Sequence, residues 1–437
     1  MQHYGAFFAE DEPITGDMSM NKKSVLIVGN GMATGRLLDE LIKRDVSQCD
    51  ITVIGDEIHG SYNRIMLSPV LAGETTIADI VNKPVEWYQD AGIQFVGGAR
   101  VNRIERSNKT VTTETGQVYS YDELIIATGS RPARIPAKNQ NLQHIYSFRT
   151  LDDVDRILAS AHSAAGEGQA VIDGARAVVV GGGLLGLEAA YGLALKGLNV
   201  TLVHRSGWLL NRQLDKQAAE LLRCVMQSKN VHFQLGCEVD RFIGEESVAG
   251  VLLSNGDRIS CQLAVIATGI SPNKELGLDA GLQGTRGIEV DEYMRTSDPF
   301  ISAVGECVEF EGTTFGLVEP IWQQCIALAD RLTLQRFTPF ADLPVATKLK
   351  VSGVQLFSAG DFITTPEHRE LLYSDIAAGI YRKILLKNNC IVGVVLFGDT
   401  RDGQDYFRMM QEQVSVEHIA PMLLMGKAFY QTQTAAA

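Results

Sequence analysis

The chain has 437 residues, of which 45% are hydrophobic and 21% charged, and a formal net charge of −13. This length predicts about three domains, and the composition is typical of a globular protein with sizeable cores. The acidic balance argues against nucleic acid as a partner. No apolar run reaches the ~18 residues of a membrane span, so we expect no membrane contact. The acidic segment 1–22 has no signal-peptide core and is expected to be a disordered tail.

The seven cysteines are scattered and form no Cys-x-x-Cys pair. This spacing argues against a metal or iron–sulfur site. Scattered cysteines in an odd number are typical of free thiols in a reducing compartment, so we expect a cytoplasmic protein.

The stretch 177–190 has the pattern of a dinucleotide-binding unit. A β-branched run, 178–180, leads into Gly-x-Gly-x-x-Gly, and apolar residues at helical spacing follow. In such a unit the first glycine permits a tight turn, the second lets the backbone approach a pyrophosphate, and the third brings the helix close to the strand. The helix N-terminus offers free N–H groups to the phosphates. We therefore expect nucleotide contacts from Gly181, Gly183, Leu184, Leu185 and Gly186.

An earlier unit of the same type departs from this pattern at one position. The buried strand 24–28 opens a glycine turn, but Thr34 occupies the third glycine position. Gly35 comes one residue late and faces about 100° around the helix, so it cannot substitute. Either the helix sits farther from the strand or the Thr34 side chain must find room. We expect nucleotide contacts from Gly29, Gly31, Met32 and Ala33.

The next strand, 51–54, ends at two acidic residues. An acid at this strand end accepts hydrogen bonds from an adenosine ribose. Asp56 is the first candidate and Glu57 the second; the alternative is that both are solvated turn residues.

Two further motifs carry a family resemblance. Tyr62-x-Arg64-x-x-Leu67-Ser68 follows the acid-ended strand, and the sequence ATGSRP follows the strand 123–126. Together with the glycine turns, these motifs resemble flavoprotein reductases that bind FAD and NAD(P)H. The stretch YNRIMLSPVLAGE is similar to the FAD domain of the assimilatory nitrite reductase large subunit and of the electron-transfer subunit of assimilatory nitrate reductase. Related ferredoxin and rubredoxin reductases carry a lysine after Leu-Ser, where this chain has Pro69.

The resemblance covers nearly the whole chain after residue 23 and implies an α/β fold. Two Rossmann-like dinucleotide-binding domains, arranged as in glutathione reductase, would precede a C-terminal α+β interface domain. The expected division is a discontinuous FAD-binding domain (23–145 and 270–338), an NAD(P)H-binding domain (146–269) and the C-terminal domain (339–437). Within these domains we expect, among other elements, a helix over 80–91 and four strands between 347 and 397.

The resemblance also implies most of the FAD contacts. A guanidinium at Arg64 suits a pyrophosphate or a flavin carbonyl, although an isolated arginine would more simply form a surface salt bridge. Glu306 replaces the aspartate that usually binds the ribityl hydroxyls; being one methylene longer, it needs a shifted backbone or a bridging water. A helix starting near Pro320 would direct its positive N-terminus at the flavin. Together with residues of the second crossover motif, the expected cofactor-binding set here is Arg64, Ser68, Val101, Ala127, Thr128, Gly129, Arg131, Ala267, Thr268, Gly269, Gly305, Glu306, Glu319 and Pro320.

The nicotinamide side rests on four polar residues. In the family, the acid at the position of Glu188 holds the nicotinamide carboxamide or ribose, and we take it as the catalytic candidate; the alternative is a solvated acid stabilised by the helix dipole. The second strand of this unit ends in His204 and Arg205, where an NADH-selective site usually carries an acid. Arg205 and Arg212 can pair with a 2′-phosphate. Because nitrite reductase relatives also carry histidine here, the resemblance favours NADH, and the residues leave NADPH open.

The expected reaction is hydride transfer from NAD(P)H to FAD and release of electrons to another redox protein, such as a nitrate or nitrite reductase chain. A disulfide reductase would need a cysteine pair near the flavin, and a peroxidase or coenzyme A reductase a cysteine near residue 63; the sequence offers neither. Two alternatives remain open, a reductase of rubredoxin or ferredoxin and a non-enzymatic FAD/NADH sensor. The large nitrite reductase that the chain resembles continues into iron–sulfur and siroheme modules, and we expect this chain to pass its electrons to a separate chain. A homodimer is compatible with the sequence.

Overall fold

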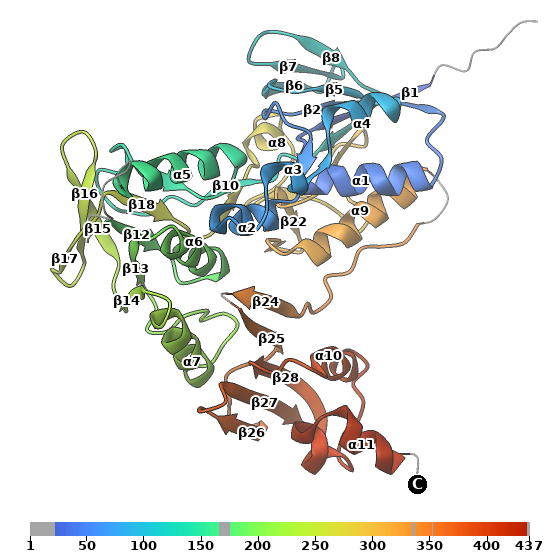
Figure 1. Ribbon diagram of the computed structural model, residues 1–437. Helices are drawn as coiled ribbons and strands as arrows, with labels where there is room; N and C mark the ends of the chain where they lie inside the picture. The colour runs from blue at the N-terminus through green and yellow to red at the C-terminus, as the bar shows by residue number, and fades with distance from the viewer. Residues whose placement is uncertain (1–21, 166–174, 334–336, 352, 435–437) are drawn as a thin grey trace, which may run out of the picture.

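The computed structural model describes residues 22–165, 175–333, 337–351 and 353–434. The expected tail therefore lies outside the described residues except for Lys22. Two parallel sheets with their helices form the upper part of the molecule, and an antiparallel sheet forms the lower part (Figure 1). This arrangement confirms the α/β class and the third, C-terminal α+β unit.

The first parallel sheet has the order β21-β9-β1-β2-β5. Its central strand is apolar and buried, as a parallel sheet covered on both faces requires. Helices α1 (Met32–Lys43) and α9 (Val318–Leu332) pack against each other beside it. The strands are β1 (Lys23–Val28), β2 (Cys49–Ile54), β5 (Gln94–Val96), β9 (Glu123–Ile126) and β21 (Ile301–Ala303).

Smaller elements surround this sheet. Two small sheets flank it, β6-β7-β8 and β20-β22-β23. Their strands are β6 (Val101–Glu105), β7 (Thr110–Thr113), β8 (Val118–Ser120), β20 (Ile288–Glu289), β22 (Val308–Phe310) and β23 (Thr313–Thr314), and the short helix α8 (Glu275–Asp279) contacts β6. The short helices η1 (Arg64–Met66) and α2 (Leu67–Ala72) follow β3 (Ser61–Tyr62), and α2 packs against the helices of the second parallel sheet.

The helix expected over 80–91 is wrong. The chain instead forms α3 (Ile77–Ile80), β4 (Val81–Lys83) and α4 (Val85–Asp90). Pro84 lies at the start of α4, where its ring would break a continuous helix. Strand β4 pairs with β3 (Ser61–Tyr62), a long-range contact that outweighs the amphipathic pattern.

The second parallel sheet has the order β11-β18-β12-β13-β14 and repeats the plan of the first. Its strands are β11 (Ile145–Ser147), β12 (Arg176–Val180), β13 (Asn199–His204), β14 (Val231–Leu235) and β18 (Leu263–Ile266), and its helices are α5 (Leu151–Ala165), α6 (Leu184–Leu195) and α7 (Lys216–Gln227). An antiparallel sheet of β15 (Val239–Gly244), β16 (Val248–Leu253) and β17 (Arg258–Ser260) extends from it.

The two crossings between the sheets pair with each other. Strand β10 (Ser130–Pro132) leaves the first sheet, β19 (Ile270–Pro272) leaves the second, and the two run antiparallel. Because sheet membership changes at these crossings, we propose the division into segments 23–145 with 270–338, 146–269 and 339–437.

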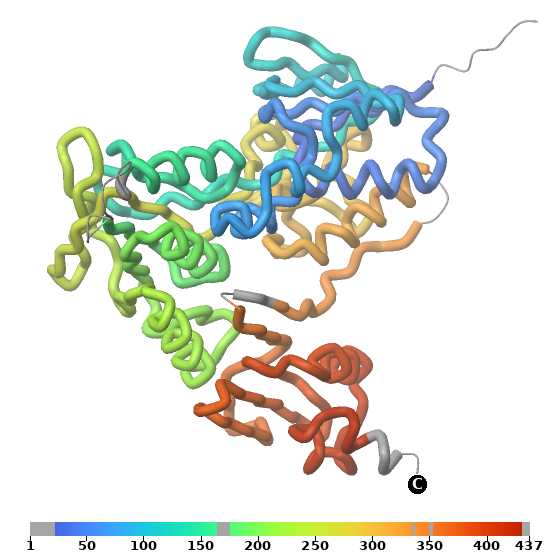
Figure 2. The backbone as a smooth tube through the Cα atoms, viewed as in Figure 1, coloured from blue at the N-terminus to red at the C-terminus, as the bar shows by residue number. Residues whose placement is uncertain are grey.

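The C-terminal sheet has the order β24-β25-β28-β27-β26 and lies beside the second parallel sheet (Figure 2). The four expected strands are present, but the edge strand β26 was missed because its side chains are mostly exposed and carry no apolar stripe. The strands are β24 (Thr347–Val351), β25 (Val354–Gly360), β26 (Arg369–Asp375), β27 (Ile380–Lys387) and β28 (Cys390–Phe397), and the helices are α10 (Gly403–Gln411), η2 (Ala420–Met425) and α11 (Lys427–Thr434).

Candidate active site

The first glycine of each nucleotide unit needs a backbone that only glycine adopts readily. Gly29 has φ +106° and Gly181 has φ +125°. A Cβ at either residue would lie 2.2 Å from a carbonyl oxygen, that of Ala127 or that of Ala267 respectively. The two Ala-Thr-Gly motifs (127–129 and 267–269) therefore lie directly against the two glycine turns.

The second glycine of each unit opens onto free space. Gly31 and Gly183 are the N-caps of α1 and α6, and a Cβ on either would meet no atom within 4 Å. Neither helix has a side-chain cap or an acidic residue in its first turn. Their N–H groups thus remain available beside Met32 and Ala33, or Leu184 and Leu185. This cradle fits the pyrophosphate of a dinucleotide.

The third position differs between the units. A Cβ on Gly186 would lie 1.9 Å from the Gly181 carbonyl oxygen, so α6 contacts its turn closely. Thr34 is fully buried at the equivalent place, and its Oγ1 donates to the Gly29 carbonyl at 2.6 Å. The Thr34 side chain has therefore found room, and it replaces close backbone packing with a hydrogen bond.

The acids after β2 have different surroundings. Asp56 is exposed. Glu57 pairs with Arg64 and accepts from the Tyr62 hydroxyl at 2.8 Å. Arg64 also donates to the Arg149 carbonyl at 2.9 Å. Glu57 thus holds the Arg64 side chain in place, whereas the Asp56 carboxylate faces solvent; the ribose contact remains a prediction.

A second charged cluster surrounds Glu306, which follows β21. Its Oε2 is paired with Arg149 and accepts from the Ser130 hydroxyl at 2.8 Å. The two clusters are continuous through Arg149, and the second cluster includes Ser130 of the crossing strand β10. Arg149 was not predicted as a site residue, because it is a single arginine between Thr150 and the buried Phe148 and belongs to no motif.

Gln324 is a further residue that sequence analysis missed. Its Oε1 accepts from the Gly305 N–H at 2.9 Å, and it is fully buried. A Cβ on Gly305 would meet Ala33 at 3.1 Å, so this amide fixes the turn that lies against the start of α1. The signal was available, because Gln324 is a polar residue on the apolar stripe of α9 with Ile321 and Leu328.

Other predicted FAD contacts have partners within the chain or lie apart. Arg131 forms a two-pronged pair with Glu275, at 2.9 and 2.6 Å. The Arg131 guanidinium is therefore paired with a carboxylate of the same chain, and its contact with a flavin remains a prediction. Val101 is buried at the start of β6.

Ser68 and Glu188 come from the two different nucleotide-binding halves and meet. Ser68 Oγ of α2 donates to Glu188 Oε2 of α6 at 2.5 Å. Burial raises the pKa of Glu188 above its ordinary value, although the Ser68 hydrogen bond acts in the opposite direction. The predicted catalytic acid therefore lies at the contact between the halves.

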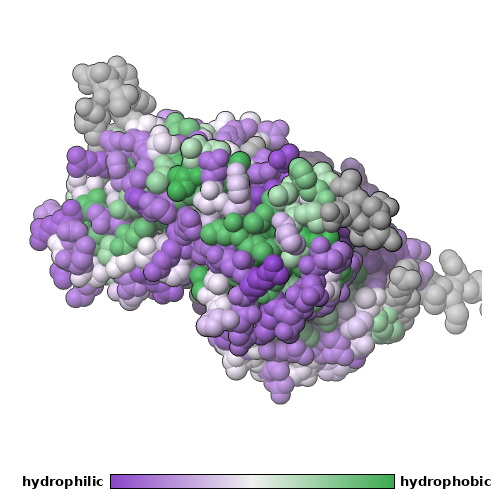
Figure 3. Space-filling model, turned by 90° about the horizontal axis from the view of Figure 1, so that it is seen from below, coloured by the Kyte–Doolittle hydropathy of each residue, from purple (hydrophilic) through white to green (hydrophobic). Residues whose placement is uncertain are grey.

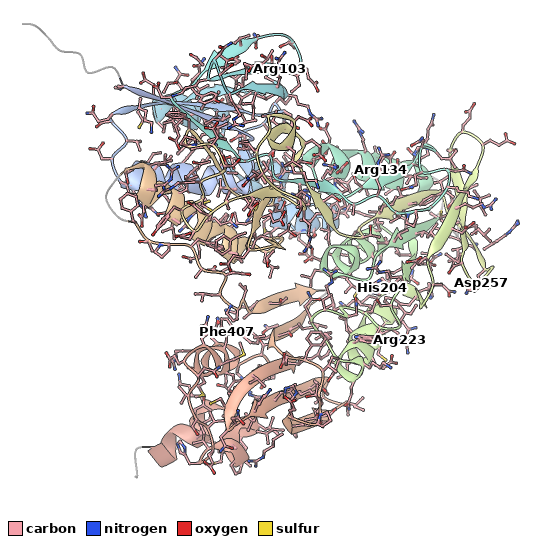
Figure 4. All side chains as sticks on the ribbon, turned by 180° about the vertical axis from the view of Figure 1, so that it is seen from behind. Arg103, Arg134, His204, Arg223, Asp257 and Phe407 are labelled. Carbon is pink, nitrogen blue, oxygen red and sulfur yellow. The ribbon has the colours of Figure 1, made fainter. Side chains whose placement is uncertain are left out.

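His204 closes over the second glycine turn at the end of β13 (Figure 4). Its Nδ1 accepts from the Gly182 N–H at 3.1 Å, and its Nε2 lies 3.3 Å from Asn211 Oδ1. Because Nδ1 is an acceptor, the neutral ring carries its proton on Nε2. Burial lowers the pKa of His204, which favours this neutral form. Arg205 and Arg212 are exposed nearby.

A cleft of about 950 Å³ brings two helix N-termini together. Leu184 of α6 and the first turn of α9, including Glu319 and Pro320, line the same cleft, and α10 closes it with Phe407. Helix α9 also lacks a side-chain cap. Figure 4 shows Phe407 on the side of α10 that faces the linker from α9. The cleft thus joins the starts of α6 and α9 to the C-terminal domain.

Two features are absent from the part of the chain that the structure describes, a helix able to span a membrane and a group of side chains able to hold a metal ion. Within them, no helix is both long and apolar enough to cross a membrane. In the same ranges, no three or more His, Cys, Asp or Glu side chains gather in a way that would hold a metal ion.

Two curated proteins are similar to this chain in sequence over most of its length. Nitrite reductase [NAD(P)H] of Bacillus subtilis is 38% identical over 93% of this chain and 49% of its own length. The assimilatory nitrate reductase electron transfer subunit of the same organism is 36% identical over 88% of this chain and 49% of its own length. The chain thus spans about half the length of these curated relatives.

Related folds and family models extend the comparison. A chain of the covalent putidaredoxin reductase–putidaredoxin complex superposes with a TM-score of 0.80 at 25% identity, covering 93% of this chain and 96% of that one. Residues 344–414 match the model of the rubredoxin NAD+ reductase C-terminal domain. Residues 23–329 match the model of the pyridine nucleotide-disulphide oxidoreductases. The two glycine turns, the shared cleft and these matches establish that the chain belongs to the pyridine nucleotide-disulphide oxidoreductase family.

Proposed function

We propose that this chain is an FAD-dependent NAD(P)H oxidoreductase that passes electrons to a redox protein in nitrate or nitrite assimilation. The observation that carries this proposal is the cleft onto which α6 and α9 both direct their N-termini. Hydride transfer depends mainly on holding two rings in contact. A cleft shared by the start of α6 and the start of α9 would let the two rings meet there, and this reaction needs no nucleophile.

Each cradle has a distinct role in the proposal. Gly29, Gly31 and the start of α1 would hold the FAD pyrophosphate, with Asp56 at the ribose. Gly181, Gly183 and the start of α6 would hold NAD(P)H. When bound, FAD supplies the chemistry that accepts a hydride and releases electrons singly. The uncapped N-terminus of α9 would stabilise negative charge at the flavin edge of the cleft.

Glu188 would orient the nicotinamide end of the coenzyme. Its carboxyl accepts a hydrogen bond from Ser68 of the other half of the molecule. In this position it could also hydrogen-bond a carboxamide or a ribose hydroxyl of the coenzyme. Burial raises the pKa of this carboxyl above its ordinary value, and the Ser68 hydroxyl, which donates to it, acts in the opposite direction.

We propose NADH as the preferred coenzyme, with NADPH also accepted. The name of the Bacillus subtilis relative, nitrite reductase [NAD(P)H], includes both coenzymes. No carboxylate stands at the end of β13 to repel a 2′-phosphate, and Arg205 and Arg212 lie exposed beside His204. The contact of His204 with the glycine turn is compatible with either coenzyme.

The acceptor is proposed from the relatives. The 36% identical relative is named an electron transfer subunit, which favours a nitrate or nitrite reductase chain as the partner. A reductase of a small rubredoxin- or ferredoxin-type protein is the second candidate, supported by the C-terminal domain match and the putidaredoxin complex. A cytoplasmic location suits the seven free cysteines; a homodimer stays a prediction.

Steady-state electron transfer tests the proposal. We expect the FAD-loaded chain to oxidise NADH with a small diffusible acceptor such as ferricyanide, and to reduce a purified nitrate or nitrite reductase partner faster than rubredoxin. Failure to oxidise NADH with any acceptor would leave a sensing role. Rapid reduction of rubredoxin alone would establish the second candidate.

A further inference from the structure

The segment 205–215, between β13 and α7, would lie at the adenosine end of the nicotinamide coenzyme, and its first half is tied to the glycine turn. The Leu210 N–H donates to the Gly182 carbonyl at 2.9 Å, and Leu210 has φ +48°. His204 holds the Gly182 N–H from the same side and contacts Asn211. Any displacement of this segment therefore moves groups that contact the dinucleotide turn.

The second half of the segment is tied to the C-terminal domain through Asp215. Asp215 caps α7 by accepting from the Ala218 N–H at 3.0 Å. Its other oxygen accepts from the Tyr381 hydroxyl at 2.6 Å and from Lys383 Nζ at 2.7 Å. The Ser358 hydroxyl donates to the Gln213 carbonyl at 2.6 Å. These three donors come from β25 and β27 of the C-terminal sheet.

All of these groups are shielded from water. Asp215, Lys383 and Ser358 are each less than a tenth exposed, and Tyr381 is 1% exposed. Lys383 also lies 3.4 Å from Glu370 of the edge strand β26, so one ammonium serves two carboxylates. Buried hydrogen bonds to charged groups fix geometry more firmly than exposed ones.

Apolar packing extends the same contact. Leu210 and Leu214 of the segment belong to one buried cluster with Leu356, Tyr381 and Phe397 of the C-terminal sheet. Figure 1 shows the C-terminal sheet next to the loop that leads into α7. Seen from below, the outer surface is mostly hydrophilic with small apolar patches (Figure 3). The segment therefore lies between the glycine turn and a rigid antiparallel sheet.

We propose that Tyr381, Lys383 and Ser358 are positioning residues for NAD(P)H, so that the C-terminal domain sets coenzyme affinity by holding the segment 205–215 against the second glycine turn. This rests on the proposed function, because it takes the second turn as the coenzyme site. Arg212, one residue before the Ser358 contact, is the group whose position relative to a 2′-phosphate would change most. The C-terminal domain would then act on the coenzyme without touching it.

The variants Tyr381→Phe and Ser358→Ala, singly and together, test the proposal. Each removes one hydroxyl and keeps the packing. We expect the double variant to raise the KM for NADH and the Kd for NAD+ about tenfold. Flavin content, and kcat at saturating NADH with ferricyanide, should stay unchanged. Lys383→Met should raise the KM for NADH further. If the Lys383→Met chain does not fold, the Tyr381→Phe and Ser358→Ala variants still test the proposal.

A matched control lies on the same strand. Lys387 Nζ pairs with Glu367 at 2.6 Å within the C-terminal domain, and this exposed pair does not contact the segment. Lys387→Met should leave both constants unchanged. A lower melting temperature with an unchanged KM and Kd in the double variant would overturn the proposal and leave a purely structural contact. If the wild-type chain binds no NADH at all, the proposed function itself fails, a distinct result.

Discussion

The two glycine turns of this chain share their first two positions and differ at the third. In both, the first glycine lies against an Ala-Thr-Gly carbonyl and the second opens onto free space. At the third, Gly186 packs directly on its turn, whereas Thr34 bonds its turn through a hydroxyl. Both turns therefore keep open space at the second glycine, where a phosphate would lie. Helix-to-turn packing can be reached in two ways.

The strand that follows each turn differs as well. After β2, Glu57 is engaged with Arg64 and Asp56 is exposed. At the end of β13, a neutral His204 instead holds the backbone of its own turn. We therefore expect specificity for the nucleotide to depend on these strand ends more than on the turns.

The largest effect is expected at Gly186. In Gly186→Ala the new Cβ would lie 1.9 Å from the Gly181 carbonyl oxygen, so α6 must move away from its turn. We expect a loss of about 2–4 kcal/mol in unfolding free energy and of NADH binding. Chemical denaturation and NADH titration measure both. Thr34→Ala is the matched substitution in the first turn; an equal loss there would contradict the difference between the turns.

The second glycines should separate the two cofactors. Gly31→Val and Gly183→Val place side chains where the chain has open space. Both variants should fold normally because the backbone there is extended. We expect Gly183→Val to lose NAD(P)H binding by about 100-fold or more while retaining FAD, and Gly31→Val to do the reverse. Flavin absorbance measures the FAD content of each variant, and titration with NADH measures its coenzyme binding. Loss of both cofactors in one variant would argue against two independent cradles.

Replacing His204 should change coenzyme choice. His204→Asp introduces a carboxylate at the end of β13, which accepts ribose hydroxyls and repels a 2′-phosphate. We expect the ratio of kcat/KM for NADH over NADPH to rise about tenfold. Asp56→Asn in the first unit is the control and should leave this ratio unchanged. An unaltered ratio in His204→Asp would place the ribose elsewhere.

Glu188 should give a smaller, pH-dependent effect. Its pKa in the folded chain is raised above the ordinary value of 4.5, mainly by burial. Its contribution to stability is thus complete below about pH 4.5 and is lost as the pH rises through the folded pKa. Glu188→Gln should remove this decline, so the difference in unfolding free energy between variant and wild type should grow with pH. A difference independent of pH would show that burial does not shift this carboxyl.

The smallest effect is expected for Thr34→Val. The substitution keeps the shape of the side chain and removes the hydroxyl that donates to Gly29. We expect a loss of about 1 kcal/mol in unfolding free energy and a modest weakening of FAD binding. Urea denaturation of the FAD-free chain isolates the stability part. No loss would mean that the hydrogen bond does not offset the missing glycine.

The sequence predicted local patterns better than contacts between distant segments. The glycine turns, the crossing motifs and the start of α9 follow from residue type and spacing, because each depends on its neighbours in the chain. The helix expected over 80–91 failed because β4 pairs with β3 across a long interval. The anchoring of Asp215 by Lys383 links residues far apart in the sequence and leaves no local pattern. Gln324 was the exception, since a polar residue on an apolar helical stripe was visible in the sequence.

Anaerobic rapid mixing of the FAD-loaded chain with NADH tests the central claim most directly. The account predicts fast bleaching of the oxidised-flavin band near about 450 nm, and its loss in Gly183→Val at unchanged flavin content. Bleaching in Gly183→Val at the wild-type rate would contradict the assignment of the second turn to the nicotinamide coenzyme. A flavin that NADH and NADPH both fail to reduce in the wild-type chain would contradict the oxidoreductase itself.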